Sequence, residues 1–287
     1  MPASRDAEFA EALPAGLTEE QALQVCTTLA GRPRGLLLDV DGTLSQLVTV
    51  SAEARLLPGI AEELERAPVY FDTLAAISGR SAAQARQIVG APHLLYFGNH
   101  GLDCWLPDAP APVTAPEAIP YLPVIAQAMD LAEEELTPRL PGVFIERKGA
   151  TGTVNTRGCA HPQQALKTAL QALRPLAERL GLRLTQGKMI AELRPPIALD
   201  KGAAIEHIVR EYKLASAIYL GDDTTDLDAF RALHRLQQAG VCAGLAVVVL
   251  HDDTPHALLA EADCSLPSIE AVPTFLHWLL EMLQARL

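Results

Sequence analysis

The sequence predicts an α/β fold: a doubly wound, mainly parallel, Rossmann-like sheet core into which a smaller α/β domain is inserted. In two parts of the chain, about residues 17–97 and 201–250, short apolar runs that suit buried parallel strands alternate with segments of helical periodicity. Between these parts the alternation stops, and six prolines lie between Leu106 and Pro123, as is typical of a connection. We therefore expect the core to comprise residues 1–107 and 198–287, and the inserted domain residues 108–197.

The individual elements follow from the spacing of apolar residues. A first helix is expected over residues 17–30, where Thr18 can act as the N-cap. In the rest of the core, the pattern predicts strands at 35–38, 71–77, 94–97, 217–220 and 245–250, and helices at 58–66, 81–89, 201–212, 226–233 and, packed into the core, 275–280. In the inserted domain it predicts helices at 124–136 and 162–180, a hairpin over 142–156 interrupted at Lys148 and Gly149, and a strand pair over 182–193.

Composition excludes several classes of protein. The 287 residues include 23 basic and 35 acidic side chains, a net charge of −12, which argues against nucleic acid or an anionic membrane as the main partner. Five cysteines without a Cys-x-x-Cys pair suit a reducing cytoplasm better than a disulfide framework or a zinc site. Residues 1–17 lack the pattern of a signal peptide, and the longest apolar run, 241–250, is too short to span a bilayer.

Acidic side chains follow two of the predicted strands. Asp39 and Asp41 come directly after the strand at 35–38, and their i, i+2 spacing directs both to the same side of an extended chain. Asp222, Asp223 and Asp226 follow the strand at 217–220. Two such clusters, if brought together, would repel each other strongly unless a cation lay between them. Oxygen ligands and a phosphate suit Mg²⁺, so the pattern predicts a magnesium site.

Each acidic cluster also has a simpler interpretation. The first could be a calcium loop or a charged turn, although an EF-type loop needs a further acid or Asn before its glycine and a helix ahead of it, and both are missing here. In the second, Thr225 or Asp226 could serve as the N-cap of the next helix. Capping by one residue does not explain the presence of three carboxylates.

Two further segments can bind an anion. Ser78, Gly79 and Arg80 follow the second predicted strand and precede a helix, where a hydroxyl and free backbone N–H groups can bind phosphate. An ordinary Ser-Gly turn explains the same residues equally well. Lys201 begins another predicted helix, and a lysine in that position is usually solvated surface. Lys201 becomes a candidate because of its place in the order of four segments along the chain, which begin at Asp39, Ser78, Lys201 and Asp222.

Taken together, Asp39-x-Asp41-Gly-Thr, Ser78, Lys201 and Gly-Asp222-Asp223-x-x-Asp226, in this order, resemble the motifs of the haloacid dehalogenase superfamily of phosphotransferases. The resemblance covers about residues 33–105 and 198–287. It implies a Mg²⁺-dependent aspartyl-phosphate mechanism on a Rossmann-like core, and the insertion resembles the α/β cap of the sugar-phosphatase branch, which gives substrate specificity.

Within that branch the chain resembles trehalose-6-phosphate phosphatases. The segments that carry the resemblance are Gly98-Asn99-His100-Gly101, Glu146-Arg147-Lys148-Gly149, Glu192-Leu193-Arg194-Pro195 and the last motif from Asp222 to Phe230. Two departures concern the sugar pocket: Val154-Asn155-Thr156-Arg157 stands where the family usually has Val-His-Tyr-Arg, and Leu227 stands where Glu is common. The resemblance implies that trehalose 6-phosphate is hydrolysed to trehalose and phosphate.

The resemblance also implies a role for each candidate residue. Asp39 would be the nucleophile, Asp41 the general acid and base, and Lys201 a ligand of the phosphoryl oxygens. Ser78, Gly79 and Arg80 would complete the phosphate site. Mg²⁺ would be held by Asp39, the backbone carbonyl of Asp41 and Asp222, with Asp223 or Asp226 behind them. The sugar would be bound by polar side chains of the core and the cap, namely Asn99, His100, Glu146, Lys148, Arg157 and Glu192.

Without the resemblance, the residues leave several alternatives open. The charged residues of the inserted domain suit the hydroxyls of a disaccharide, but they also suit a solvated strand face with paired charges, and His100 alone suits a turn or a core position. A phosphatase of glucosylglycerate, sucrose or hexose phosphate fits the same motifs. A dehalogenase lacks a leaving group to protonate, so Asp41 argues against it; a non-catalytic sugar-phosphate sensor is the third alternative. We expect a cytoplasmic monomer with a small sugar phosphate as its partner.

Overall fold

The computed structural model describes residues 13–48 and 53–286, and their contacts divide the chain into two units. The first contains the described residues up to Gly101, residues 105–111 and those from Leu199 onward; the second contains residues 102–104 and 112–198. The sequence predicts limits of 108 and 197 for the inserted domain. The second unit includes residues 102–104 because β4 (Asp103–Trp105) pairs antiparallel with β5 (Val113–Thr114) across the proline-rich connection.

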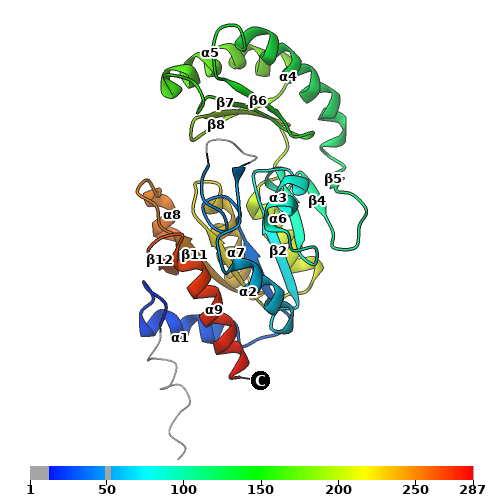
Figure 1. The fold of residues 1–287 in the computed structure, drawn as a ribbon. Helices are drawn as coiled ribbons and strands as arrows, with labels where there is room; N and C mark the ends of the chain where they lie inside the picture. The colour runs from blue at the N-terminus through cyan, green and yellow to red at the C-terminus, as the bar shows by residue number, and fades with distance from the viewer. Residues whose placement is uncertain (1–12, 49–52, 287) are drawn as a thin grey trace, which may run out of the picture. The chain divides into compact units, whose positions relative to one another are not determined.

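The main sheet has eight strands in the order β12-β11-β10-β1-β2-β3-β4-β5. Every pair from β12 to β3 is parallel, which confirms the predicted α/β class with a mainly parallel sheet (Figure 1). The strands not yet bounded are β1 (Arg34–Leu38), β2 (Thr73–Ile77), β3 (Leu95–Gly98), β10 (Ser216–Gly221), β11 (Ala243–Val249) and β12 (Cys264–Leu266). Of the strands in the described part of the chain, β4, β5 and β12, each two or three residues long, are missing from the sequence prediction.

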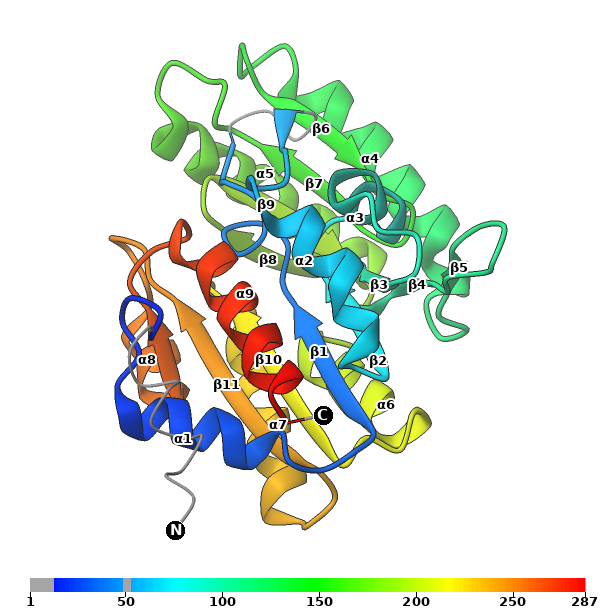
Figure 2. The same ribbon diagram turned by 60° about the horizontal axis from the view of Figure 1, so that its bottom comes forward.

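Helices cover both faces of this sheet. They are α1 (Glu19–Thr28), α2 (Ile60–Arg66), α3 (Ala82–Val89), α6 (Lys201–Glu211), α7 (Asp226–Gln238), α8 (His256–Glu261) and α9 (Ala271–Gln284), with short 3₁₀ turns at Ala67–Val69 and Asn99–Gly101. On one face, Ile218 and Leu220 of β10 pack in a core cluster with residues of α1, α2, α3 and α9. On the other face, the ring of Tyr219 packs edge-on against Phe230 of α7, with 6.0 Å between the ring centroids. Figure 2 shows α2 and α9 in front of the strands.

Local sequence explains where several helices begin and end. Thr18 forms a capping box with Gln21 at the start of α1, as predicted. Ser81 and Gln84 do the same for α3, and Gly90 ends α3 in the left-handed conformation. Helix α7 continues five residues beyond its predicted end at 233, because Leu236 adds a further buried position to the apolar face of the helix.

The second unit is a four-stranded antiparallel sheet with helices on one face. The sheet order is β6-β7-β9-β8. Val154, Ala191 and Leu193 pack in a core cluster with Met129 and Leu173 of the two long helices. The elements are β6 (Phe144–Arg147), β7 (Gly152–Asn155), β8 (Arg183–Gly187), β9 (Ile190–Arg194), α4 (Leu122–Leu136) and α5 (Pro162–Leu180), preceded by a 3₁₀ turn at Ile119–Tyr121. The predicted hairpin and strand pair are both present.

Candidate active site

The first acidic cluster lies at the carboxyl end of the central strand. All five residues of β1 are buried, and Asp39 extends its pairing, because the backbone N–H of Asp39 donates to the carbonyl oxygen of Leu220 at 2.9 Å. The neighbouring strand β10 ends at Gly221, so Asp39 and Asp222 leave adjacent parallel strands on the same edge of the sheet. This edge is where open α/β sheets bind ligands.

Three carboxylates converge at this edge. Oxygen atoms of Asp39, Asp222 and Asp226 all lie within 4.8 Å of one another, and all three residues are buried. Lys201, at the first turn of α6, lies among them: Nζ is 2.5 Å from Oδ1 of Asp39 and 2.6 Å from Oδ1 of Asp226. The side chain of Asp200 caps α6 by accepting from the N–H of Ala203 at 2.8 Å, which fixes the start of the helix that carries Lys201.

Asp226 is fully bonded by the protein. Besides Lys201, its carboxylate accepts from the hydroxyl of Tyr219 and from the backbone N–H groups of Asp222, at 3.0 Å, and Asp223, at 2.9 Å. It therefore holds the second acidic loop and the lysine in place. Asp223 itself is exposed, and its carboxylate accepts from the N–H of Thr224. Among the described residues, Asp226 and not Asp223 is the third member of the buried group.

The surroundings of Asp222 differ from those of Asp226. Its Oδ1 is buried and has no hydrogen-bond partner among the described residues. Such an atom is costly unless something else binds it. An oxygen-rich set with one unsatisfied carboxylate oxygen suits a hard divalent cation. The buried acidic cluster could therefore hold a metal ion.

The electrostatics of the cluster point the same way. Burial raises the pKa of Asp39 to about 7, and the charge of Asp226 adds to the rise, while Lys201 opposes it. Burial, Asp39 and Asp226 raise the pKa of Asp222 well above its usual range. Burial alone would lower the pKa of Lys201, but the carboxylates of Asp226 and Asp39 raise it overall. One lysine thus faces three buried carboxylates, and the site favours additional positive charge.

Asp41 and Arg80 form a two-pronged ion pair. Nε of Arg80 donates to Oδ2 of Asp41 and Nη2 donates to Oδ1, both at 2.6 Å. The sequence predicts that Arg80 binds the phosphate, whereas in the structure its guanidinium binds both oxygens of the predicted general acid. The N–H of Arg80 also donates to Oγ of Ser78 at 3.1 Å, and Ser78 is fully buried. The turn after β2 is therefore linked to the loop after β1.

The segment after β3 is built against the same turn. The N–H of His100 donates to the carbonyl of Ser78 at 2.9 Å, and the N–H of Asn99 donates to the carbonyl of Arg80 at 2.6 Å. Both Asn99 and His100 have positive φ angles, 50° and 57°, which side chains other than glycine seldom adopt. A Cβ at Gly79 would lie 2.8 Å from the His100 ring, so any larger residue there would displace this ring.

Two of the predicted sugar-binding residues of the second unit, Glu146 and Glu192, lie in one row across its sheet. Strand register aligns Glu146 with Thr153, Thr153 with Glu192 and Glu192 with Thr185. Because side chains alternate along a strand, this row lies on the face opposite the packed helices. Glu146, Thr153 and Glu192 are nevertheless at least 91% buried, with exposures of 9%, 1% and 5%. This burial is inconsistent with a simple solvated strand face.

An ion pair joins Glu192 of this row to Lys148, which follows β6. Nζ of Lys148 lies 3.4 Å from Oε1 of Glu192, and both side chains are less than 10% exposed, at 8% and 7%. Asn155 is buried, and its Oδ1 accepts from the N–H of Arg157 at 3.0 Å. The guanidinium of Arg157 donates to the carbonyl of Lys188 at 3.1 Å. Thus Glu146, Lys148 and Glu192 lie together, whereas Arg157 lies at the end of β7 against the turn between β8 and β9.

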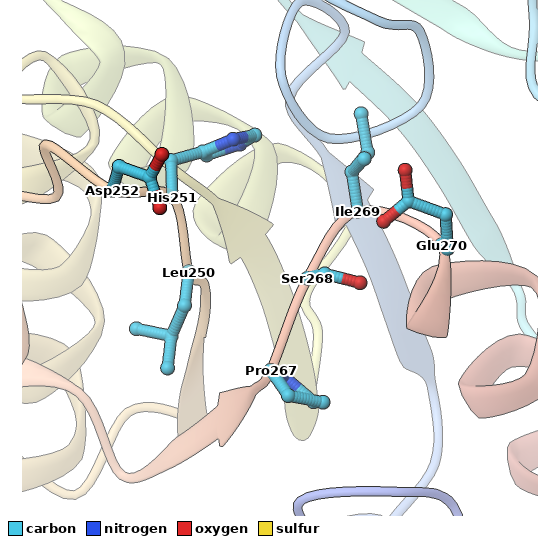
Figure 3. A pocket seen from close by; sticks show the side chains of 7 residues that line it. All are labelled: Leu250, His251, Asp252, Pro267, Ser268, Ile269 and Glu270. Atoms are coloured by element: carbon cyan, nitrogen blue, oxygen red, sulfur yellow. The ribbon is translucent and has the colours of Figure 1, made fainter.

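Sequence reasoning missed one histidine near the acidic cluster. Nε2 of His251 lies 2.8 Å from the carbonyl oxygen of Gly42 and 3.5 Å from Oδ2 of Asp222. His251 follows β11 almost directly, so its position at the end of a third parallel strand was the signal that could have identified it. It also lines a pocket of about 330 Å³, in which residues 250–252 form one side and residues 267–270 the other (Figure 3).

The sequence is similar to those of several bacterial trehalose-phosphate phosphatases. The chain is 33% identical over 230 residues to the trehalose-phosphate phosphatase of Mycobacterium avium, covering 78% of this chain and 56% of that protein. It is 33% identical over 238 residues to the trehalose-phosphate phosphatase of Mycobacterium tuberculosis H37Rv, covering 81% and 58%. The chain therefore spans little more than half the length of the curated relatives it matches.

Solved structures agree on the fold. The C-terminal domain of Candida albicans trehalose-6-phosphate phosphatase superposes with a TM-score of 0.77 at 21% identity, covering 94% of this chain and 99% of that one. No helix in the described part of this chain is long and apolar enough to cross a membrane. The model of the family described as trehalose-phosphatase matches residues 37–258, which include both acidic clusters, the Ser78 turn, Lys201 and the whole second unit. The chain belongs to the trehalose-phosphatase family.

Proposed function

We propose that this protein is a Mg²⁺-dependent phosphatase that hydrolyses trehalose 6-phosphate to trehalose and phosphate through an aspartyl-phosphate intermediate. The observation that carries the proposal is the buried carboxylate of Asp39, with Lys201 at 2.5 Å and the unsatisfied oxygen of Asp222 nearby. A nucleophile, a cation that binds phosphoryl oxygens and a vacant carboxylate oxygen are what phosphoryl transfer needs.

The proposed Mg²⁺ would be held by Asp39, Asp222 and the backbone carbonyl of Asp41. The residues fit, since they offer hard oxygen donors and Oδ1 of Asp222 has no other partner among the described residues. The bound ion would neutralise charge on the transferring phosphoryl oxygens. Asp226 would support the metal site without binding the ion directly, because its carboxylate already accepts from Lys201, Tyr219 and two backbone N–H groups. Asp223 is predicted from the sequence to bind the metal, but it is exposed, so we do not include it among the proposed ligands.

In the first proposed step, Oδ2 of Asp39 attacks phosphorus, because Oδ1 is bonded to Lys201. The bond between phosphorus and the sugar oxygen breaks, and Asp41 gives that oxygen its proton. In the second step, a water attacks the aspartyl-phosphate at phosphorus, Asp41 takes the proton of that water, and Asp39 is released. Ser78, Gly79 and Lys201 would bind the phosphoryl oxygens, while the N–H of Arg80 donates to Oγ of Ser78. The ion pair of Asp41 with Arg80 has to open before Asp41 can serve as the acid.

The second unit would act as the cap that binds the sugar. Its buried row of Glu146, Thr153 and Glu192, with Lys148 beside it, offers charged acceptors and a donor for hydroxyl groups. A buried polar row of this kind discriminates strongly, because a wrong ligand leaves its members unpaired. Asn99 and His100, and Arg157 from the end of β7, are further candidate sugar ligands. On this basis we assign core and cap roles to the two units.

One observation favours a second candidate substrate. Asn155 is buried on the same face as Glu146 and Glu192, at a position where the resembling family usually has His. An amide there changes which hydroxyls can be bound, so another sugar phosphate of similar size is the alternative. The five cysteines are all free, and this supports a reducing, cytoplasmic location; we propose that the enzyme acts as a monomer.

Phosphate release from a panel of sugar phosphates tests the proposal. Trehalose 6-phosphate should be the preferred member over sucrose, hexose and glucosylglycerate phosphates, and EDTA should abolish release until Mg²⁺ is restored. Preference for another member would overturn the substrate while leaving the mechanism. Release that continues at full rate in EDTA would overturn the metal. No release from any member would indicate the sensor that the sequence also allows.

A further inference from the structure

We propose that His251 is a positioning residue for the metal site, which holds the nucleophile loop and Asp222 together through a hydrogen bond to Gly42. The inference rests on the proposed function, because it assumes that Asp222 binds Mg²⁺. No family motif described above contains His251, and the structure alone brings it to the site.

The bond that His251 makes has a defined direction. The carbonyl oxygen of Gly42 can only accept, so Nε2 of His251, at 2.8 Å, must carry the hydrogen and donate it. The same nitrogen lies 3.5 Å from Oδ2 of Asp222. One N–H thus faces both the loop that carries Asp39 and Asp41 and the carboxylate proposed to bind the metal.

Gly42 is the residue through which this bond can affect Asp222. Its φ angle is +85°, and a Cβ there would lie 2.1 Å from Oδ2 of Asp222. The backbone of Gly42 is therefore packed directly against this carboxylate, and any other residue would displace it. A shift of the Gly42 peptide would move the surface on which Asp222 rests.

The backbone of His251 is itself fixed. The N–H of His251 donates to Oγ1 of Thr254 at 2.7 Å, and the N–H of Thr254 donates to the carbonyl of His251 at 3.1 Å. The preceding N–H, of Leu250, donates to the carbonyl of Leu266 at 2.9 Å. The histidine therefore projects from a closed turn at the end of the buried strand β11, at the edge of the pocket in Figure 3.

The bonding of Asp222 explains why such a residue is useful. Its Oδ1 has no partner among the described residues, so this oxygen is the one proposed for the ion. A carboxylate that binds a metal is oriented by the hydrogen bonds and contacts on its other side. His251 and Gly42 supply that side, and their loss should weaken binding of the ion, by about 10-fold if His251 resembles other residues that orient a metal ligand.

A matched pair of variants isolates the hydrogen bond. In H251Q the amide nitrogen can reach the place of Nε2 and donate to Gly42, whereas the shorter side chain of H251N cannot. Both side chains are polar amides that differ by one methylene group. A difference in Mg²⁺ affinity between the two variants therefore shows whether the amide must reach Gly42. His256→Asn, at an exposed histidine on the following helix, controls for loss of a histidine nearby. Binding of Mg²⁺ alone to metal-free protein is measured by calorimetric titration.

The expected result is that H251N binds Mg²⁺ about 10-fold more weakly than the unmodified protein, while H251Q and H256N stay within about 3-fold. Equal affinities for H251N and the unmodified protein would overturn the inference and leave the proposed function standing. H251Q as weak as H251N would overturn the role of the hydrogen bond. If the unmodified protein binds no Mg²⁺, the proposed metal site fails, and the inference fails with it.

Discussion

Arg80 binds both carboxylate oxygens of Asp41, at 2.6 Å each, so the predicted general acid is tied to a residue that the sequence assigned to phosphate binding. The geometry favours a role for Arg80 in holding Asp41. The two roles predict a different substrate dependence of kcat/KM, because in the first step only protonation of the leaving group depends on the side chain of Asp41.

Arg80→Ala removes the side chain that positions Asp41 in the resting enzyme, so kcat/KM for trehalose 6-phosphate should fall by at most about 100-fold, the usual scale of acid catalysis. The value for an activated aryl phosphate should fall much less. The aryl leaving group departs without a proton, whereas the sugar oxygen needs one. Steady-state kinetics with both substrates checks this. Equal losses on both would return Arg80 to the phosphate.

The raised pKa of Asp39 predicts how the metal-free protein responds to pH. A carboxyl group whose pKa rises from 3.8 to about 7 on folding binds more protons in the folded state. Its contribution to stability is therefore complete below pH 4 and is lost as the pH rises toward 7. Mg²⁺ should offset the loss, so the rise in Tm on adding Mg²⁺ should be small at pH 5 and larger at pH 7.5.

The same titration of the D39N variant provides the control for that pH effect. Without the ionisable group, the increase of the Mg²⁺-induced Tm shift between pH 5 and pH 7.5 should diminish. A shift that is the same at both pH values in the unmodified protein would argue that burial of Asp39 does not control it.

Asp226 and Asp223 should differ sharply in their effect on stability. Asp226 is fully buried and bonded to Lys201, Tyr219 and two backbone N–H groups. Asp226→Asn removes one of the two carboxylates that neutralise Lys201 and should cost about 3–5 kcal/mol of unfolding free energy. Asp223→Asn, at an exposed position, should change it by no more than about 0.5 kcal/mol. Urea unfolding of both variants measures the difference, and similar costs would contradict this structure of the cluster.

The buried row of the second unit should control specificity. Ala at Glu146, Lys148 or Glu192 should each reduce kcat/KM for trehalose 6-phosphate at least about 10-fold, given about 1.5–3 kcal/mol for a hydrogen bond to a charged group. An aryl phosphate too small to use this row should be hydrolysed nearly as before. Arg147→Ala is the matched control, because Arg147 lies between two of these residues but is 43% exposed. Parallel losses of kcat/KM on both substrates would indicate that these residues act through the stability of the protein or the closing of the proposed cap instead of through sugar binding.

Much of the fold could be predicted because its strands are buried on both faces and read as apolar runs. β1 is an example, since all five of its residues are buried. The strands β4, β5 and β12 could not be predicted, because two or three residues show no periodicity. The convergence of Asp39, Lys201 and Asp222 also followed from strand ends and helix starts.

Other features of the site depend on contacts between residues that are distant in sequence or on the local course of the backbone. Asp223 and Asp226 are both aspartates of one short segment, so the sequence does not distinguish them. In the turn after β10, the backbone N–H groups of Asp222 and Asp223 donate to Asp226, and this turn buries Asp226. Arg80 looked like a phosphate ligand because a sequence cannot show which anion a guanidinium meets. His251 lies 209 residues from Gly42 in sequence, so no local pattern links them.

The central claim is that Asp39 carries the phosphoryl group during turnover. Rapid acid quenching of the enzyme with trehalose 6-phosphate and Mg²⁺, followed by peptide mapping, locates that group directly. We expect a phosphoryl group on Asp39 in the unmodified enzyme. In a folded Asp39→Asn variant we expect no bound phosphoryl group and no release of phosphate. A phosphoryl group on any other residue, or substantial turnover by Asp39→Asn, would contradict it.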